Sequence, residues 1–239
     1  MKKIFWTSLT LLLMGLIPQT WASYASMPSN YQIVNAPTAY TLLHGEYDLN
    51  LWMYQNGGLF LRGNVGLTSF FMFGFSGNAT NVIGHGPIQV QDPRLSLKFK
   101  ILDQNQFPFA AAVGWDDRGY GVLSGNRFVP GQQTGFYIVT SKEYSVPLFF
   151  QVHFGVNALE LNNVSAKNNV AAFTGISFAL AHPLIFNFEL NQLFTAEWQF
   201  NANIVVNVEN DLQMGLNFID INSNTNFSRI LSVDYYGFF

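Results

Sequence analysis

The sequence contains no cysteine and few charged residues. Of its 239 residues, 10% are Asp, Glu, Lys or Arg, whereas an ordinary soluble domain has about 25%. The absence of cysteine excludes a disulfide scaffold, thiol catalysis and a zinc site with cysteine ligands. A net charge of −3 provides no basic patch, so we expect no nucleic-acid partner. So little charge also argues against an ordinary soluble enzyme.

Aromatic residues are abundant instead. They form 16% of the chain, with 24 Phe and 10 Tyr, and 49% of all residues are hydrophobic. Such a chain has enough apolar surface to fold and is not disordered. Its length suits one large domain or at most two small ones, and we find neither a second domain nor an internal repeat.

The N-terminus has the composition of a secretory signal peptide. Lys2 and Lys3 precede an apolar run that continues to about Pro18, and small residues follow at Ala22 and Ala25. This order predicts a cleaved signal peptide over residues 1–25, with cleavage after Ala22 as the alternative. A membrane anchor is disfavoured because the apolar run is short for a transmembrane helix.

Beyond this segment, apolar and polar residues alternate with a period of two. In residues 94–101, for example, Leu95, Leu97 and Phe99 alternate with Ser96 and Lys98. The same alternation occurs in residues 148–157, 184–191, 197–206 and 211–218. Successive side chains of a strand point to opposite faces, so each segment predicts a strand with one apolar and one polar face.

Three features favour a transmembrane β-barrel over a soluble sandwich. The segments are about 8 to 11 residues long, close to the length that crosses a bilayer at a tilt. Their polar faces are rich in Asn, Gln, Ser and Gly, as expected of a confined lumen. The chain ends in alternating apolar residues that include Tyr235 and Phe239, which resembles the terminal strand of bacterial outer-membrane barrels. We interpret Tyr235 and Phe239 as the membrane-insertion signal, with outer-membrane lipid and the barrel-assembly machinery as partners.

The predicted fold class is therefore all-β: one antiparallel up-and-down barrel over residues 44–239, in the bacterial outer membrane. Residues 26–43 precede it as an extended arm or a lumen plug. We predict about twelve strands, with ten as the alternative, and expect the long connections, including a mobile loop at 117–133, to face outward. The strands are expected at residues 44–54, 58–65, 68–76, 93–102, 108–116, 134–142, 147–157, 170–180, 183–191, 195–208, 211–220 and 227–239.

Charged side chains on the polar faces should lie in the lumen. They are Glu46, Asp48, Arg62, Arg94, Lys98, Lys100, Glu189, Glu197 and Asp234. Because the fourth and tenth strands of such a barrel lie on opposite sides, a basic wall would face an acidic wall. One interpretation is a narrow polar pore whose selectivity these charges set. The other is a filled lumen in which they pair, with Phe60, Phe70, Met72 and Phe173 also pointing inward.

Catalytic motifs of outer-membrane enzymes are absent from the sequence. Barrel proteases need an Asp-x-His pair, and phospholipases and deacylases pair a His with a Ser two residues later, and neither occurs. The four histidines, His44, His85, His153 and His182, are scattered along the chain. We therefore predict no catalytic residue, no metal site and no cofactor.

Short motifs along the mature chain resemble one known family. They are Asn35-Ala36-Pro37-Thr38-Ala39, Asn56-Gly57-Gly58-Leu59, Val65-Gly66-Leu67-Thr68, Ile83-Gly84, Pro93 with Leu97 and Lys98, Pro108 with Ala110 and Ala112, Val113-Gly114-Trp115-Asp116, Gly135-Phe136-Tyr137, Ser141-Lys142, and Arg229 with Tyr235 and Phe239. In this order they are similar to the YjbH-like outer-membrane barrels, which are associated with exopolysaccharide or capsule secretion. Members of that family are often larger, with more than one barrel region, whereas this chain has one.

The resemblance implies a non-enzymatic component of envelope exopolysaccharide export or attachment, with polysaccharide or polysaccharide-export proteins as partners. A small passive pore or a purely structural barrel is the alternative function. An outer-membrane enzyme that cleaves lipids or peptides is the second alternative.

Overall fold

The structure is a computed structural model, and it describes residues 31–118, 121–124, 127–130, 135–144, 149–159, 170–181, 183–194, 198–223 and 227–239. The expected signal peptide, residues 26–30 of the arm, Glu197 and His182 lie outside the described residues. Within the described part of the chain, no helix has the length and apolar character needed to span a membrane.

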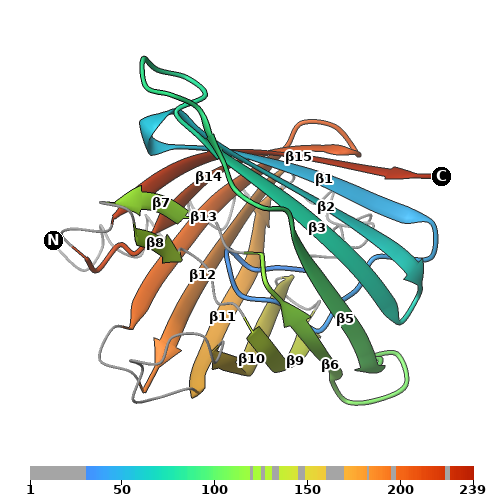
Figure 1. Ribbon diagram of the computed structural model, residues 1–239. Coiled ribbons are helices and arrows are strands. Elements are labelled where there is room, and N and C mark those ends of the chain that lie inside the picture. The colour runs from blue at the N-terminus through green and yellow to red at the C-terminus, as the bar shows by residue number, and fades with distance from the viewer. Residues whose placement is uncertain are drawn as a thin grey trace, which may run out of the picture.

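The described strands form a closed antiparallel barrel (Figure 1). Each barrel strand pairs with the next, β2 pairs with β3, and β1 pairs with β15 to close the ring. The twelve barrel strands are β1 (Glu46–Tyr54), β2 (Gly58–Thr68), β3 (Phe71–Thr80), β5 (Arg94–Leu102), β6 (Ala110–Asp116), β9 (Gly135–Tyr144), β10 (Phe150–Leu159), β11 (Val170–Ala181), β12 (Leu184–Leu193), β13 (Gln199–Asn207), β14 (Leu212–Ile219) and β15 (Ser228–Phe238). The predicted fold class and strand number are confirmed, and the predicted bounds differ by no more than four residues at either end.

Short secondary-structure elements occur in the connections between barrel strands. A 3-10 turn, η2 (Gln55–Gly57), joins β1 to β2, and β4 (Gln89–Val90) pairs beside β3. Within the expected loop 117–133, β7 (Gly121–Ser124) pairs with β8 (Arg127–Pro130) as a separate hairpin. The loop therefore contains strands that we did not predict, because four residues are too few for a period-two pattern to be recognised.

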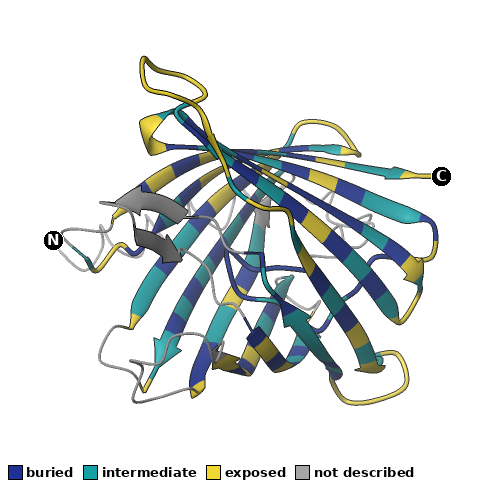
Figure 2. Cartoon of the chain, in the orientation of Figure 1, coloured by how far each residue is buried: buried dark blue, intermediate teal, exposed yellow. Residues whose placement is uncertain are grey.

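The barrel is apolar outside, and most of its inward-facing side chains are polar. Along the twelve barrel strands, buried residues mostly alternate with exposed or partly exposed ones (Figure 2). The outward set includes Phe99, Ile138, Phe154 and Leu216, and the exposed fraction of Ile138 is 62%. An apolar hollow of about 450 Å³, lined by residues such as Leu97, Trp115 and Phe136, also lies on this outer wall. A soluble barrel would place its apolar side chains inside, so the exterior suits the hydrocarbon core of a bilayer.

Residues 31–42 lie inside the barrel. They form the blue segment that crosses its interior in Figure 1. The segment turns back on itself, because the Ile33 N–H donates to the Ala36 carbonyl at 2.9 Å and the Thr38 N–H donates to the Tyr31 carbonyl at 3.1 Å. Ala36, Thr38 and Leu42 are fully buried. We call residues 31–42 the inner segment.

Wall glycines allow this segment to approach closely. A Cβ at Gly175 of β11 would lie 2.6 Å from Ile33 Cδ1, and one at Gly66 of β2 would lie 2.9 Å from the carbonyl carbon of Leu42. Any larger residue would push the chain away from the wall at these positions. The inner segment also supplies apolar packing, since Ile33, Val34, Ala36 and Ala39 join Trp52, Phe60 and Phe173 in one buried cluster.

Candidate functional site

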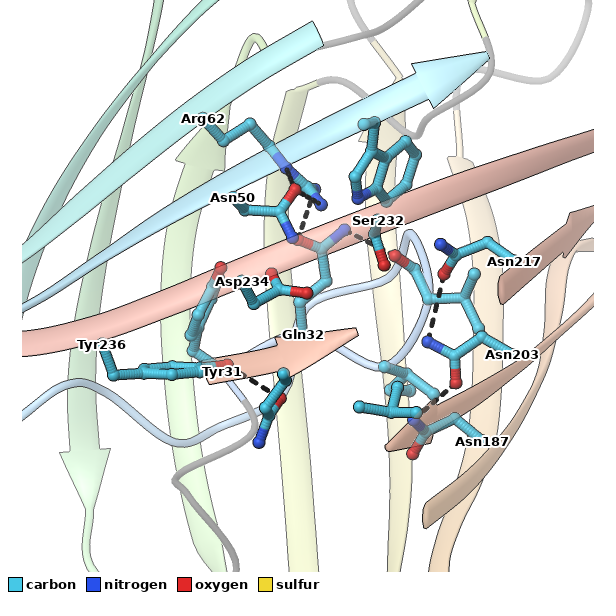
Figure 3. Close-up of a pocket in the computed structure, with 15 residues that line it drawn as sticks. Tyr31, Gln32, Asn50, Arg62, Asn187, Asn203, Asn217, Ser232, Asp234 and Tyr236 are labelled. Carbon is cyan, nitrogen blue, oxygen red and sulfur yellow. Dashed lines mark hydrogen bonds between the residues drawn. The ribbon is translucent and has the colours of Figure 1, made fainter. Parts of the chain in front are cut away.

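Strand register arranges the polar wall residues in rows. Ser177 of β11, Asn187 of β12, Asn203 of β13 and Asn217 of β14 are consecutive cross-strand partners. The Asn187 Nδ2 group donates to Asn203 Oδ1 at 2.6 Å, and Asn203 Nδ2 donates to Asn217 Oδ1 at 3.1 Å (Figure 3). We call Asn187, Asn203 and Asn217 the amide row. It gives one side of the lumen a surface with donors and acceptors but no formal charge.

Arg62 lies on β2, which β1 and β15 separate from the amide row. Its guanidinium donates to Asn50 Oδ1 at 3.0 Å and to the Gln32 side-chain oxygen, so it joins β1 to the inner segment (Figure 3). The Arg62 Cζ atom lies 4.3 Å from the ring centroid of Trp52, a cation–π contact. Arg62 is therefore buried, and its hydrogen bonds are directed toward β1 and the inner segment.

Asp48 is bound to the same segment from β1. The Tyr31 hydroxyl donates to Asp48 Oδ2 at 2.6 Å, and Asn64 Nδ2 donates to Asp48 Oδ1 at 2.7 Å. Burial raises the pKa of Tyr31 well above its ordinary value, and the neighbouring Asp48 charge raises it further, so the hydroxyl keeps its proton. Arg118 folds into the lumen nearby, where it pairs with Asp116 at 2.8 Å and donates to Asn64.

Lys98 and Glu189 hold the inner segment by its main chain. The Lys98 Nζ group donates to the carbonyl oxygens of Tyr31 at 2.6 Å and Tyr40 at 3.0 Å. Glu189 Oε2 accepts the N–H groups of Val34 at 2.9 Å, Asn35 at 2.9 Å and Ala36 at 2.7 Å. Its other oxygen accepts the side-chain amides of Asn191 and Asn201. Hydrogen bonds to ionised groups are roughly twice as strong as neutral ones, so these are the main anchors of the segment.

The structure therefore differs from both arrangements that we considered for the lumen charges. Lys98 and Glu189 neither face each other across open water nor pair directly. The inner segment lies between them and presents carbonyl groups to the ammonium and N–H groups to the carboxylate. This contact was beyond sequence reasoning, because Val34 and Glu189 are 155 residues apart in the chain.

The other predicted lumen charges are either buried in the wall or bound to partners near the strand ends. Asp234 is buried in the row that also holds Gln213 and Asn50. Arg94 pairs with Asp117 at 3.2 Å and Lys100 pairs with Asp103 at 2.7 Å, both pairs being partly exposed at strand ends. Glu46 accepts the Leu43 N–H at 2.7 Å where the chain enters β1.

Of the four large apolar residues expected inside, three are there. Phe60, Met72 and Phe173 are almost completely buried. The prediction for Phe70 is wrong, because this residue lies in the two-residue turn between β2 and β3 and is 55% exposed. The period-two argument fails there since a turn residue does not follow the alternation of a strand.

Tyr235 and Phe239 lie near the C-terminal end of the chain, where β15 ends. Tyr235 points outward from β15 and is 43% exposed, and Phe239 is 80% exposed. Tyr47 of β1 contacts both rings, with centroid distances of 6.3 and 6.4 Å. The three rings form an aromatic group at the edge of the apolar exterior.

A small cavity remains between the inner segment and the amide row. Its volume is about 40 Å³, which admits a few water molecules but no larger solute. Its wall is drawn in Figure 3 and includes Tyr31, Asn50, Trp52, Arg62, Asn187, Asn203, Gln213, Asn217, Ser232, Asp234 and Tyr236. The inner segment therefore occupies the space that the amide row would otherwise line.

The three histidines that the structure describes, His44, His85 and His153, do not form a recognisable catalytic or metal site. Ser141 Oγ and His153 Nδ1 are 2.8 Å apart, but Ser141 also accepts the Ala39 N–H and His153 Nε2 has no hydrogen-bond partner among the described residues. His44 contacts the Leu67 carbonyl, and His85 lies in the connection between β3 and β5. No group of three His, Asp or Glu side chains in the described ranges could hold a metal ion.

Comparisons with known proteins identify no family for the chain. No family model matches it, and no curated protein sequence matches it. A solved structure of the KdgM porin is similar, with 9% sequence identity and a TM-score of 0.49, and the match covers 80% of this chain and 98% of that chain. This likeness says nothing about what the present chain binds or transports. The YjbH-like resemblance stays a prediction.

Proposed function

We propose that this chain is an outer-membrane β-barrel that forms a narrow passive pore for small polar solutes, closed in the observed state by its inner segment. The observation that best supports this proposal is an apolar exterior combined with a lumen wall of hydrogen-bonded amides. Only helices and closed barrels satisfy every backbone group inside a bilayer, and this chain is a closed barrel. The expected signal peptide favours export to the outer membrane.

The hydrogen-bonding groups of the amide row favour polar solutes and do not require the solute to be charged. The amide row offers paired donors and acceptors, and the neighbouring Gln213 and Ser232 extend this neutral surface. The proposal contains no catalytic step. Export or attachment of an envelope exopolysaccharide, which the family resemblance implies, is a narrower hypothesis that the comparisons do not support.

Swelling of liposomes in neutral sugars of increasing size tests this proposal. The full chain and a variant lacking residues 31–42 would be reconstituted separately, after a difference in gel mobility between unboiled and boiled samples has established that each is folded. We expect the variant to admit the smallest sugars and to exclude the larger ones, and the full chain to admit much less. A folded variant that admits no sugar would contradict the pore and favour a purely structural barrel.

A further inference from the structure

The wall binds the inner segment largely through main-chain atoms. Glu189 accepts three consecutive N–H groups, and Ser141 Oγ accepts the Ala39 N–H at 2.8 Å. Lys98 donates to two main-chain carbonyls. Every residue of a peptide carries the carbonyl acceptor, and every residue except proline carries the N–H donor.

From this arrangement we infer that the lumen contains a peptide-binding site, which the inner segment occupies as a tethered ligand and which short extended peptides can occupy in its place. The inference rests on the proposed pore, because a displaced inner segment is what makes the site accessible. Short peptides are then the class of solute that this lumen binds.

The two buried charges explain why a peptide suits the site. Among the described residues neither Glu189 nor Lys98 has an ion-pair partner, yet both are almost completely buried. A buried charge is costly unless hydrogen bonds compensate it. A peptide main chain presents N–H groups to the carboxylate and carbonyls to the ammonium, so it compensates both charges at once.

Side-chain contacts at one end of the inner segment add selectivity. The Tyr31 hydroxyl binds Asp48, and the Gln32 side chain accepts from Arg62 and donates to the Val34 carbonyl at 2.8 Å. Gly175 leaves room for Ile33 against the wall. A peptide with the sequence of residues 31–42 should therefore bind better than an unrelated peptide of equal length, although the main-chain contacts are common to both.

Binding of a synthetic peptide to the variant lacking residues 31–42 tests the inference. The probe is a fluorescently labelled peptide of residues 31–42, and its fluorescence anisotropy is followed in detergent with the folded variant. The matched probe carries N-methyl groups on the amides of Val34, Asn35 and Ala36, which removes the three donors to Glu189 and keeps every side chain. We expect the unmodified peptide to bind and the N-methylated peptide to bind at least about tenfold more weakly.

A Glu189→Gln change in the same variant shows whether N-methylation weakens binding through the lost hydrogen bonds to Glu189 or through poorer packing of the whole peptide. It should weaken the unmodified peptide by about tenfold and should reduce the penalty for N-methylation, since both changes remove the same contact. Glu209→Gln, on an exposed residue between β13 and β14, is the matched control and should bind like its parent. Equal binding of both peptides, or no binding to the folded variant, would overturn the inference.

The outcomes for the pore and for the peptide site are distinguishable. A variant that admits sugars but binds no peptide keeps the proposed pore and overturns the peptide site. A variant that binds the peptide through Glu189 but admits no sugar supports the site and contradicts the pore. If the deletion prevents folding, the full chain with Glu189→Gln replaces it: a labelled peptide should then exchange into the lumen faster than in the Glu209→Gln control, and equal rates would overturn the inference.

Discussion

Glu189 shows how this barrel keeps a carboxylate buried with no ion-pair partner in the described part of the chain. Its two oxygens together accept three main-chain N–H groups and two side-chain amides. A carboxylate has about four lone-pair positions, so its hydrogen-bonding capacity is filled. The residue is thereby tied to the inner segment, and a change at Glu189 should alter the closure of the lumen more than the barrel wall itself.

Outward-facing apolar residues occur both in the middle of the strands and near the strand ends. Leu216, in the middle of β14, is 42% exposed on the outer face, whereas Phe136 faces outward next to the start of β9 and is 69% exposed. If the exterior contacts hydrocarbon, Leu216→Arg should lower the free energy of unfolding by about 2–4 kcal/mol and Phe136→Arg by about 0–1 kcal/mol.

Reversible denaturant unfolding in lipid vesicles measures both changes. The two variants carry the same new side chain, so its intrinsic properties cancel in the comparison. Equal losses at the two positions would mean that the middle of the outer wall is not in the bilayer core.

At the level of single residues, the sequence predicted which face a side chain occupies but not what it contacts. The alternation places Leu97 outside and Lys98 inside, as observed. It could not predict that Lys98 binds the carbonyls of Tyr31 and Tyr40, because contacts between distant segments leave no local pattern. Phe70 shows the other limit, since a turn interrupts the period of two.

At the scale of elements, the strands were predictable because each carries its own facing pattern. The antiparallel register follows from that pattern, since a slip by one residue would turn an entire apolar face into the lumen. The hairpin of β7 and β8 and the two-residue strand β4 were missed because they are too short to show alternation. The fold of the inner segment was equally inaccessible, because its hydrogen bonds are mostly to the distant barrel wall.

The β7–β8 hairpin provides a test of topology. It connects β6 to β9 at the barrel end opposite the turn between β2 and β3. With the long connections outward, an epitope tag inserted after Ser124 should bind antibody on intact cells that lack a thick capsule. The same tag inserted between Ser69 and Phe70 is the matched control and should bind antibody only after the cells are opened. The opposite labelling pattern would reverse the topology.

The terminal strand provides a second prediction at this scale. Phe239 is 80% exposed and stacks near Tyr47, so its removal should cost little packing inside the barrel. If it acts as an insertion signal, deletion of Phe239 should lower the amount of assembled protein in cells while refolding in detergent stays unchanged. Quantification of the heat-modifiable form on gels from both preparations measures this. Equal losses in cells and in detergent would indicate a structural role instead.

At the scale of the whole molecule, the barrel separates an apolar exterior from a polar interior, and its own chain fills that interior. The inner segment contributes apolar residues to the central cluster and main-chain groups to the wall charges. The cavity of about 40 Å³ between the inner segment and the amide row is too small for a sugar or a peptide. On the proposed function, the lumen would be a passage that the bound inner segment closes, and the wall itself would not be collapsed.

Ion current across a planar bilayer tests this claim most directly. The full chain and the variant lacking residues 31–42 would be compared at equal protein amounts, with barrel formation established for each by its mobility on unboiled gels. We expect steady single-channel currents from the variant, and currents from the full chain that are absent or rare. Equal currents from both proteins, or no current from the folded variant, would contradict it.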